Sequence, residues 1–274
     1  MTDILSPGTW PGLVTLAIVT FVAGAVNSVA GGGTILTFPV LASILPADPG
    51  RMVTANATST IGLWPGAIAG AWAYRQERAG QPPWAAWLLV PSVVGAVAGA
   101  VLVLVLPPRM FDICVPWLIL SAAILFALQP QLSRLGRASG AAGADRPAAS
   151  RMGMAVALQF FVGLYGGYFG AGIGILMLAV LGLLGLGDIH RLNAVKNVLG
   201  MAINGTAAIL FAAGSLLVGV HDVSWLHAAI MAVAAVLGSF AGAGVARRLP
   251  APLVRRCVAA IGFALAAYYF WRSA

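Results

Sequence analysis

Two stretches concentrate glycine inside otherwise apolar sequence, and the first of them also contains neutral polar side chains. Residues 27–34 read Asn-Ser-Val-Ala-Gly-Gly-Gly-Thr, and residues 170–174 read Gly-Ala-Gly-Ile-Gly. Consecutive glycines disfavour a continuous helix, so the backbone N–H groups at each break need new partners. A helix that restarts at Thr34 points its positive end at the break, which makes an anion site without a charged side chain. Tight packing of helices through small residues is the alternative interpretation of the same glycines.

A second set of polar side chains lies on one predicted helix of the C-terminal half. Lys196, Asn197 and Asn204 follow Asn193 by three, four and eleven residues, which places all four on one helix face. Residues 56–60, Asn-Ala-Thr-Ser-Thr, are the counterpart in the first half. Exposing so many amides to lipid is costly, so this face is expected to look into the protein. Lys196 either attracts an anion or extends to the membrane surface, because it lies about one turn inside the predicted helix.

Groups for catalysis or metal binding do not cluster in this sequence. All seven acidic residues fall in or at the edges of predicted loops, and the three histidines lack the spacing of metal ligands. General acid–base catalysis needs placed carboxylates or histidines, and a membrane carrier of cations usually needs a buried acid. We therefore expect no enzyme, no metal, no cofactor and no cationic substrate.

The composition is that of an integral membrane protein. The chain has 274 residues, of which 61% are hydrophobic and 8% are charged, against roughly a quarter charged residues in soluble domains. In a soluble protein the net charge of +8 would suggest nucleic acid, but here most cations fall between apolar runs, which is typical of membrane topology. The sequence predicts an all-α polytopic membrane protein with about eight to ten transmembrane elements.

The chain divides into two similar halves. Residues 129–151 form a linker between a first membrane repeat, 1–128, and a second, 152–274. A shift of 140 positions aligns residues 21–41 with 161–181 and gives seven identities in 21 positions. An apolar alphabet alone gives about two or three, so the halves are predicted to be structural repeats.

The loop arginines predict how the two repeats are oriented. If each glycine-broken segment crosses the membrane once, the arginines show no bias between the two sides. If each enters and returns as a re-entrant or discontinuous hairpin, eleven arginines fall on one side and three on the other. The second arrangement follows the positive-inside rule and predicts inverted repeats, a cytoplasmic linker and periplasmic termini. Whether the hairpins reach full depth stays open.

The motifs together resemble a known family. Residues 25–33, 55–60 and the Trp-Pro-Gly of residues 64–66 resemble the first repeat of the sulfite exporter TauE/SafE family, also called the toluene sulfonate uptake permease family. Residues 166–174 and 192–197 look like its second repeat, so the resemblance covers essentially the whole chain. It implies a secondary transporter of the bacterial inner membrane for small sulfur-containing anions such as sulfite or organosulfonates, including sulfoacetate.

Carried over by motif position, the resemblance implies a set of substrate contacts in each half. In the first half they are Asn27, Gly31, Gly32, Gly33, Thr34, Asn56, Thr58 and Ser59. In the second half they are Gly170, Gly172, Gly174, Lys196, Asn197 and Asn204.

These observations lead to one expected function with two alternatives. We expect alternating access that moves a small anion across the inner membrane, with export as the expected direction although no residue fixes it. A passive anion channel, or a permease for another small organic anion, would use the same donors. The expected partners are the substrate and the lipid bilayer, with no nucleic acid; a homodimer is one option for the assembly.

Overall fold

The computed structural model describes the helical body of the protein. Its described residues are 10–29, 32–73, 84–138, 149–183, 189–219, 223–245 and 251–273, and their regular structure is entirely helical. The helices are α1 (Trp10–Val29), α2 (Thr34–Ile44), α3 (Arg51–Ala73), α4 (Trp84–Trp87), α5 (Leu89–Val105), α6 (Pro108–Ala138), α7 (Ala149–Tyr168), α8 (Ile173–Leu183), α9 (Ile189–Ala213), the π-helical turn η3 (Gly214–Val218), α10 (Trp225–Val245) and α11 (Ala251–Ser273). Because α6 continues through Ala138, the first part of the predicted linker is helical.

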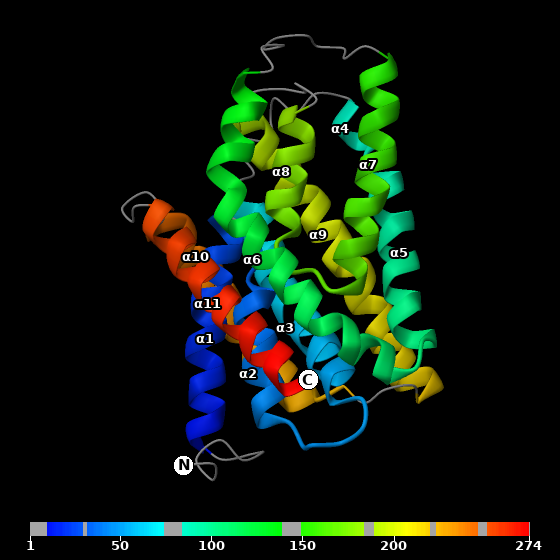
Figure 1. The fold of residues 1–274 in the computed structure, drawn as a ribbon, viewed down its shortest axis with the longest axis vertical. Helices are drawn as coiled ribbons and strands as arrows, with labels where there is room; N and C mark the ends of the chain where they lie inside the picture. The colour runs from blue at the N-terminus through cyan, green and yellow to red at the C-terminus, as the bar shows by residue number, and fades with distance from the viewer. Residues whose placement is uncertain are drawn as a thin grey trace.

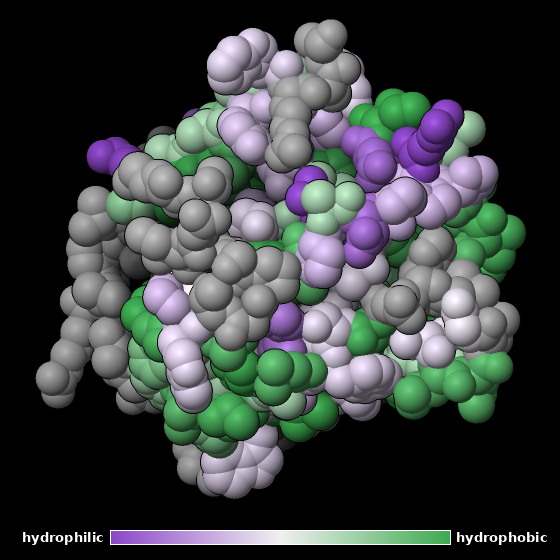
Figure 2. Space-filling view, turned by 90° about the horizontal axis from the view of Figure 1, so that it is seen from below, coloured by the Kyte–Doolittle hydropathy of each residue, from purple (hydrophilic) through white to green (hydrophobic). Residues whose placement is uncertain are grey.

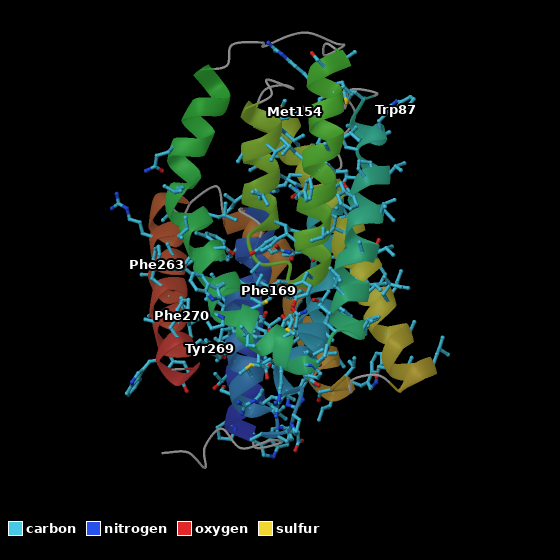
Figure 3. All side chains as sticks on the ribbon, turned by 45° about the vertical axis from the view of Figure 1, so that its right-hand side comes forward. Trp87, Met154, Phe169, Phe263, Tyr269 and Phe270 are labelled. Carbon is cyan, nitrogen blue, oxygen red and sulfur yellow. The ribbon has the colours of Figure 1, made fainter. Side chains whose placement is uncertain are left out.

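The surface of this bundle is that of a membrane protein. Five described helices are long and apolar enough to cross a bilayer, and α2 and α8 are shorter apolar helices. Large apolar side chains such as Trp87, Met154 and Phe263 are exposed, whereas Phe169 is buried (Figure 3). Seen from the lower end, strongly hydrophilic residues lie mainly in the upper middle of the face, and hydrophobic ones lie mostly toward its left, right and lower edges (Figure 2). The prediction of an all-α polytopic membrane protein is confirmed.

The packing exchanges helices between the two halves. Helix α1 of the first half packs on α10 of the second, and α7 of the second half packs on α5 of the first (Figure 1). Helix α10 also packs on α3, and α5 also packs on α9. At the centre α3 packs on α9, and α6 packs on α11. Each of these contacts has a counterpart with the halves exchanged, as expected for repeats around a pseudo-two-fold axis. The inverted-repeat relation itself stays a prediction.

Glycines let paired helices approach through their backbones. On α5, a Cβ at Gly95 or Gly99 would collide with the α7 backbone at Phe160 or Leu164. On α10, a Cβ at Gly238 would collide with the backbone of Phe21 in α1. Small residues four positions apart are a common means of close helix packing in membranes.

Each glycine cluster turns the chain back on itself. Figure 1 shows α7 running down from the upper end and α8 returning to it, while α2 leads back to the lower end, where α3 begins. The turns use left-handed backbone conformations, with φ of 103° at Gly32, 81° at Gly170 and 77° at Gly172. Because side chains with a Cβ rarely adopt such angles, glycine is required at these points.

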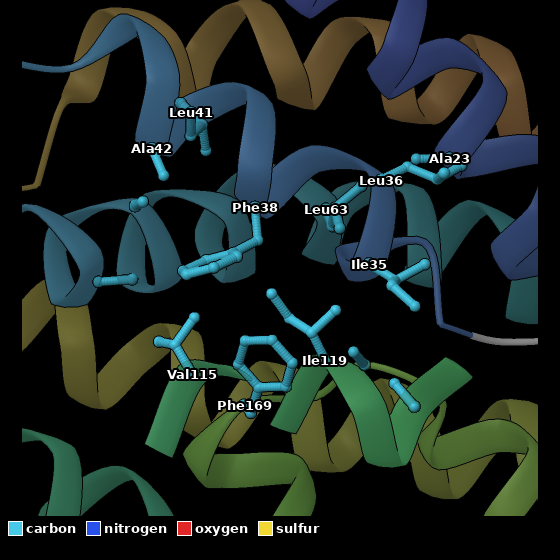
Figure 4. Close-up of a cluster of buried hydrophobic side chains, with 14 of the residues drawn as sticks. Ala23, Ile35, Leu36, Phe38, Leu41, Ala42, Leu63, Val115, Ile119 and Phe169 are labelled. Atoms are coloured by element: carbon cyan, nitrogen blue, oxygen red, sulfur yellow. The ribbon is translucent and has the colours of Figure 1, made fainter. Parts of the chain in front are cut away.

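The two turns touch each other near the middle of the molecule. A Cβ at Gly32 would lie 2.6 Å from the backbone nitrogen of Gly172 and 2.9 Å from Cε2 of Phe126. Beside the turns, Phe38 of α2 packs edge-on against Phe169 with ring centroids 5.3 Å apart, next to Val115 of α6 (Figure 4). The core therefore holds the two glycine breaks together.

The contact between the two breaks predicts that Gly32→Ala destabilises the protein strongly. The substitution combines a left-handed φ, which costs about 1–3 kcal/mol, with a collision against rigid backbone. Gly219→Ala is the matched control, because Gly219 has φ 65° and open space around it. Thermal unfolding in detergent should show a much larger fall in Tm for Gly32→Ala. Equal falls would contradict the contact.

Helix packing through glycine predicts that Gly99→Val separates α5 from α7. A valine there cannot fit against the backbone near Leu164. Gly153→Val is the control. Gly153 also lies inside a helix, α7, but a Cβ at this position would have nothing within 4 Å. We expect aggregation or a lowered Tm for Gly99→Val alone, measured by size-exclusion chromatography and thermal unfolding; a variant as stable as the control would refute it.

Candidate functional site

A small cavity lies where four helices from both halves meet. It is bordered by α1, α3, α8 and α9, and five of the predicted contacts line it: Asn27, Gly174, Lys196, Asn197 and Asn204. Its volume is about 30 Å³, counted as the space open to the centre of a water-sized sphere. One water needs about 10–15 Å³ on this measure, so the cavity admits only a few water molecules or a small ligand.

Asn27 connects the first glycine break to the cavity. Its Oδ1 accepts a hydrogen bond from the backbone N–H of Gly32, with 3.0 Å between nitrogen and oxygen. This bond satisfies one of the donors that the helix break releases. Since the side-chain oxygen is used in this way, the NH₂ group of Asn27 is what it can offer to a ligand.

The second break presents the start of a helix to the cavity. Helix α8 begins at Ile173, and both Ile173 and Gly174 line the cavity. The carbonyl of Gly172 accepts the N–H groups of Ile175 and Leu176, but no described group accepts those of Ile173 and Gly174. Free N–H groups in the first turn and the positive end of the helix dipole favour an anion at this position.

Helix α9 adds a cation and two amides on one face. Lys196 is only 3% exposed, so it does not extend to the membrane surface, and it borders the cavity. Asn197 carries a buried Nδ2 with no hydrogen-bond partner among the described residues. Asn204 donates from Nδ2 to the carbonyl of Gly200 at 2.9 Å, and its Oδ1 lies 3.5 Å from where a Cβ of Gly170 would be.

The cavity is positively charged on balance. Among the described residues that line it, Lys196 is the only charged side chain. The two described acids, Asp48 and Asp112, are exposed and lie outside it. A buried cation beside amide donors, with no carboxylate among the described lining residues, suits an anionic ligand, because these groups donate charge-assisted and neutral hydrogen bonds to its oxygens.

Three predicted contacts of the first half lie outside the cavity lining. Asn56 donates from Nδ2 to the carbonyl of Tyr168 at 2.9 Å and so supports the second break. Thr58 accepts the N–H of Ser224 at 3.1 Å, and the Ser59 hydroxyl lies 2.7 Å from that of Thr37. Their side chains hold elements together, which places them in supporting positions.

The remaining predicted contacts form the breaks themselves. Gly32, Gly33, Gly170 and Gly172 belong to the two turns, and Thr34 begins α2. The Thr34 hydroxyl lies beside Gly170, 3.8 Å from where a Cβ would be. Gly31 falls outside the described residues.

Several residues at the site carry no clear signal in the sequence. Gly66 and Gly70 of α3 line the cavity. Their spacing of four residues indicates a helix face of small side chains, but not that this face borders a cavity. The Tyr165 hydroxyl donates to the carbonyl of Ala171 at 2.8 Å and fixes the second break. Nothing in the spacing of Tyr165 distinguishes it from a packing tyrosine. Gln159 lies outside the cavity lining and donates from Nε2 to the Ser92 hydroxyl at 2.9 Å.

Comparison with known proteins places the chain in a family. A family described as "Sulfite exporter TauE/SafE" matches residues 16–269. A "Probable membrane transporter protein" of Haemophilus influenzae is 26% identical over 256 residues, which cover 93% of each chain. A "Probable membrane transporter protein ORF9" of Sinorhizobium sp. is 25% identical over 256 residues, 93% of this chain and 90% of that protein. No solved structure matches. The match over nearly the whole chain confirms the resemblance read from the motifs: this chain belongs to the sulfite exporter TauE/SafE family, a family of membrane transporters and not of enzymes.

Proposed function

We propose that the protein is a secondary transporter that carries a small sulfur-containing oxyanion across the bacterial inner membrane. The observation that carries this proposal is buried Lys196 beside half-buried Asn197, in a cavity whose described lining includes no carboxylate. The description of the family as sulfite exporters supports this substrate class and export as the direction. In this proposal the linker faces the cytoplasm and both termini face the periplasm.

The donor set suits an oxyanion with several equivalent acceptor oxygens. Lys196 and Asn197 approach from α9, Asn27 from α1, and the N–H groups of Ile173 and Gly174 from the start of α8. A sulfite or sulfonate group accepts hydrogen bonds in several directions, so donors from three helices can bind it at once. Most of these donors are neutral, which favours release as well as binding. The cavity volume of about 30 Å³ favours the smallest members of the class, such as sulfite.

Alternating access fits the position of the site between the halves. Asn27 belongs to the first half and Lys196 to the second, and the two glycine breaks touch beside them. Movement of one half against the other would therefore change the site and its openings together. The buried aromatic residues Phe38, Phe111 and Phe169 fill the space beside the breaks, which favours a carrier over an open channel.

The donor set predicts the transport defects of two variants. Lys196→Gln should lower the initial rate of sulfite transport into proteoliposomes by about tenfold or more, because a charge-assisted hydrogen bond is lost. Asn197→Ala should lower it by about five- to tenfold through loss of a neutral donor. Asn193→Ala is the control, since Asn193 lies one turn away on the same helix and does not line the cavity.

Three outcomes of this assay would contradict the proposal. Equal initial rates of sulfite transport in all three variants would show that the anion does not bind in this cavity during transport. No flux above empty liposomes for sulfite, sulfoacetate or another small sulfur oxyanion would exclude the substrate class. Conductance in planar bilayers without counterflow would indicate a passive channel.

A further inference from the structure

A second and larger space shares no lining residue with the anion cavity. It is a groove between α1 and α11 with α2 as its floor, lined mainly by apolar residues such as Val19, Leu36, Val40, Ile261 and Leu265. Its volume is about 420 Å³ on the measure that gives 30 Å³ for the cavity. Ile261 is 44% exposed, so the groove opens toward the bilayer.

The polar members of the groove gather at one end of it. Ser43 lies in the last turn of α2, Arg51 begins α3, and Tyr268 lies near the end of α11. Helix α11 runs so that Tyr269 and Phe270 lie below Phe263 (Figure 3). Exposed Trp271 follows at the same end, and aromatic residues of this kind typically mark the membrane interface. The groove therefore runs from headgroup depth into the hydrocarbon region.

The groove exists because one helix pair is less closely packed than its counterpart. Helix α6 packs closely along α8, whereas α11 packs less closely on α2. Under the predicted repeat relation these two pairs correspond, so space that protein fills in one half is open in the other. An apolar groove in a membrane protein is filled by something apolar, because voids forfeit contact energy.

The charges at the polar end limit which molecule can fill it. Arg51 borders the groove and interacts electrostatically with Asp112 of α6, without a direct ion pair between them. A phosphate beside Arg51 satisfies the cation, and a cationic amine on the same headgroup satisfies the carboxylate. We propose that the groove binds a zwitterionic aminophospholipid, with an acyl chain along α2 and α11 and its phosphate on Arg51. This lipid site depends only on the membrane setting, and not on the transported anion.

Native mass spectrometry of the full chain with added phosphatidylethanolamine tests the site. Wild-type protein should retain one lipid, and Arg51→Gln should lower the retained fraction about tenfold. Arg109→Gln is the matched control, because Arg109 is exposed near the start of α6 and does not line the groove. Equal retention by wild type and Arg51→Gln would overturn the proposal.

A second pair of variants tests the groove itself and is read in the same experiment. Leu265→Trp should fill the groove and displace the lipid, whereas Ala264→Trp, which faces away from it, should not. Phosphatidylglycerol retained as well as phosphatidylethanolamine would overturn the assignment of the headgroup. A dimer that dissociates in Leu265→Trp but not in Ala264→Trp would show that a second copy, and not a lipid, fills the groove. Tm values for all variants confirm that they are folded.

Discussion

The constraint on which this structure depends is the cost of an unpaired backbone N–H or C=O group in a membrane. Two helices of the bundle are interrupted by glycines, and each interruption releases such groups near the middle of the molecule. The protein satisfies several of them from inside: Asn27 accepts from the first break, while Asn56 and Tyr165 donate to carbonyls of the second. The N–H groups of Ile173 and Gly174, two residues that line the cavity, have no acceptor among the described residues. In our account, an anion is the partner that completes them.

The two halves contribute different groups to the cavity. The first half contributes the amide of Asn27, which also accepts the N–H of Gly32 at the first break. The second half contributes the start of α8 and the Lys196–Asn197 pair. Both breaks must stay in contact for these groups to share one cavity, and Gly32 at the contact leaves no room for a side chain. Rigid packing therefore holds the donors in place, and helix pairs such as α11 and α2 are packed less closely. Looser pairs are where movement between the halves would cost least.

The sequence could predict the helical membrane fold, the breaks and the polar face of α9, because each is encoded by local composition or spacing. Lys196, Asn197 and Asn204 do share one cavity, as their spacing implies. The part of α3 that borders the cavity was harder to predict. The sequence pointed to Asn56, Thr58 and Ser59, whereas Gly66 and Gly70, further along the same helix, line the cavity. Periodicity shows that a face is polar, but not which neighbour it meets. Tyr165 shows the same limit, because its role depends on a turn six residues away in sequence.

The central claim is that a small oxyanion occupies the cavity between the halves. Crystals of the protein grown with selenite, a heavier analogue of sulfite, would locate the anion through the anomalous scattering of selenium. The account predicts one site bordered by Lys196, Asn197 and Asn27, within hydrogen-bond distance of the Lys196 ammonium and the Asn197 amide. Selenium bound only elsewhere, with the cavity holding water at saturating selenite, would contradict it.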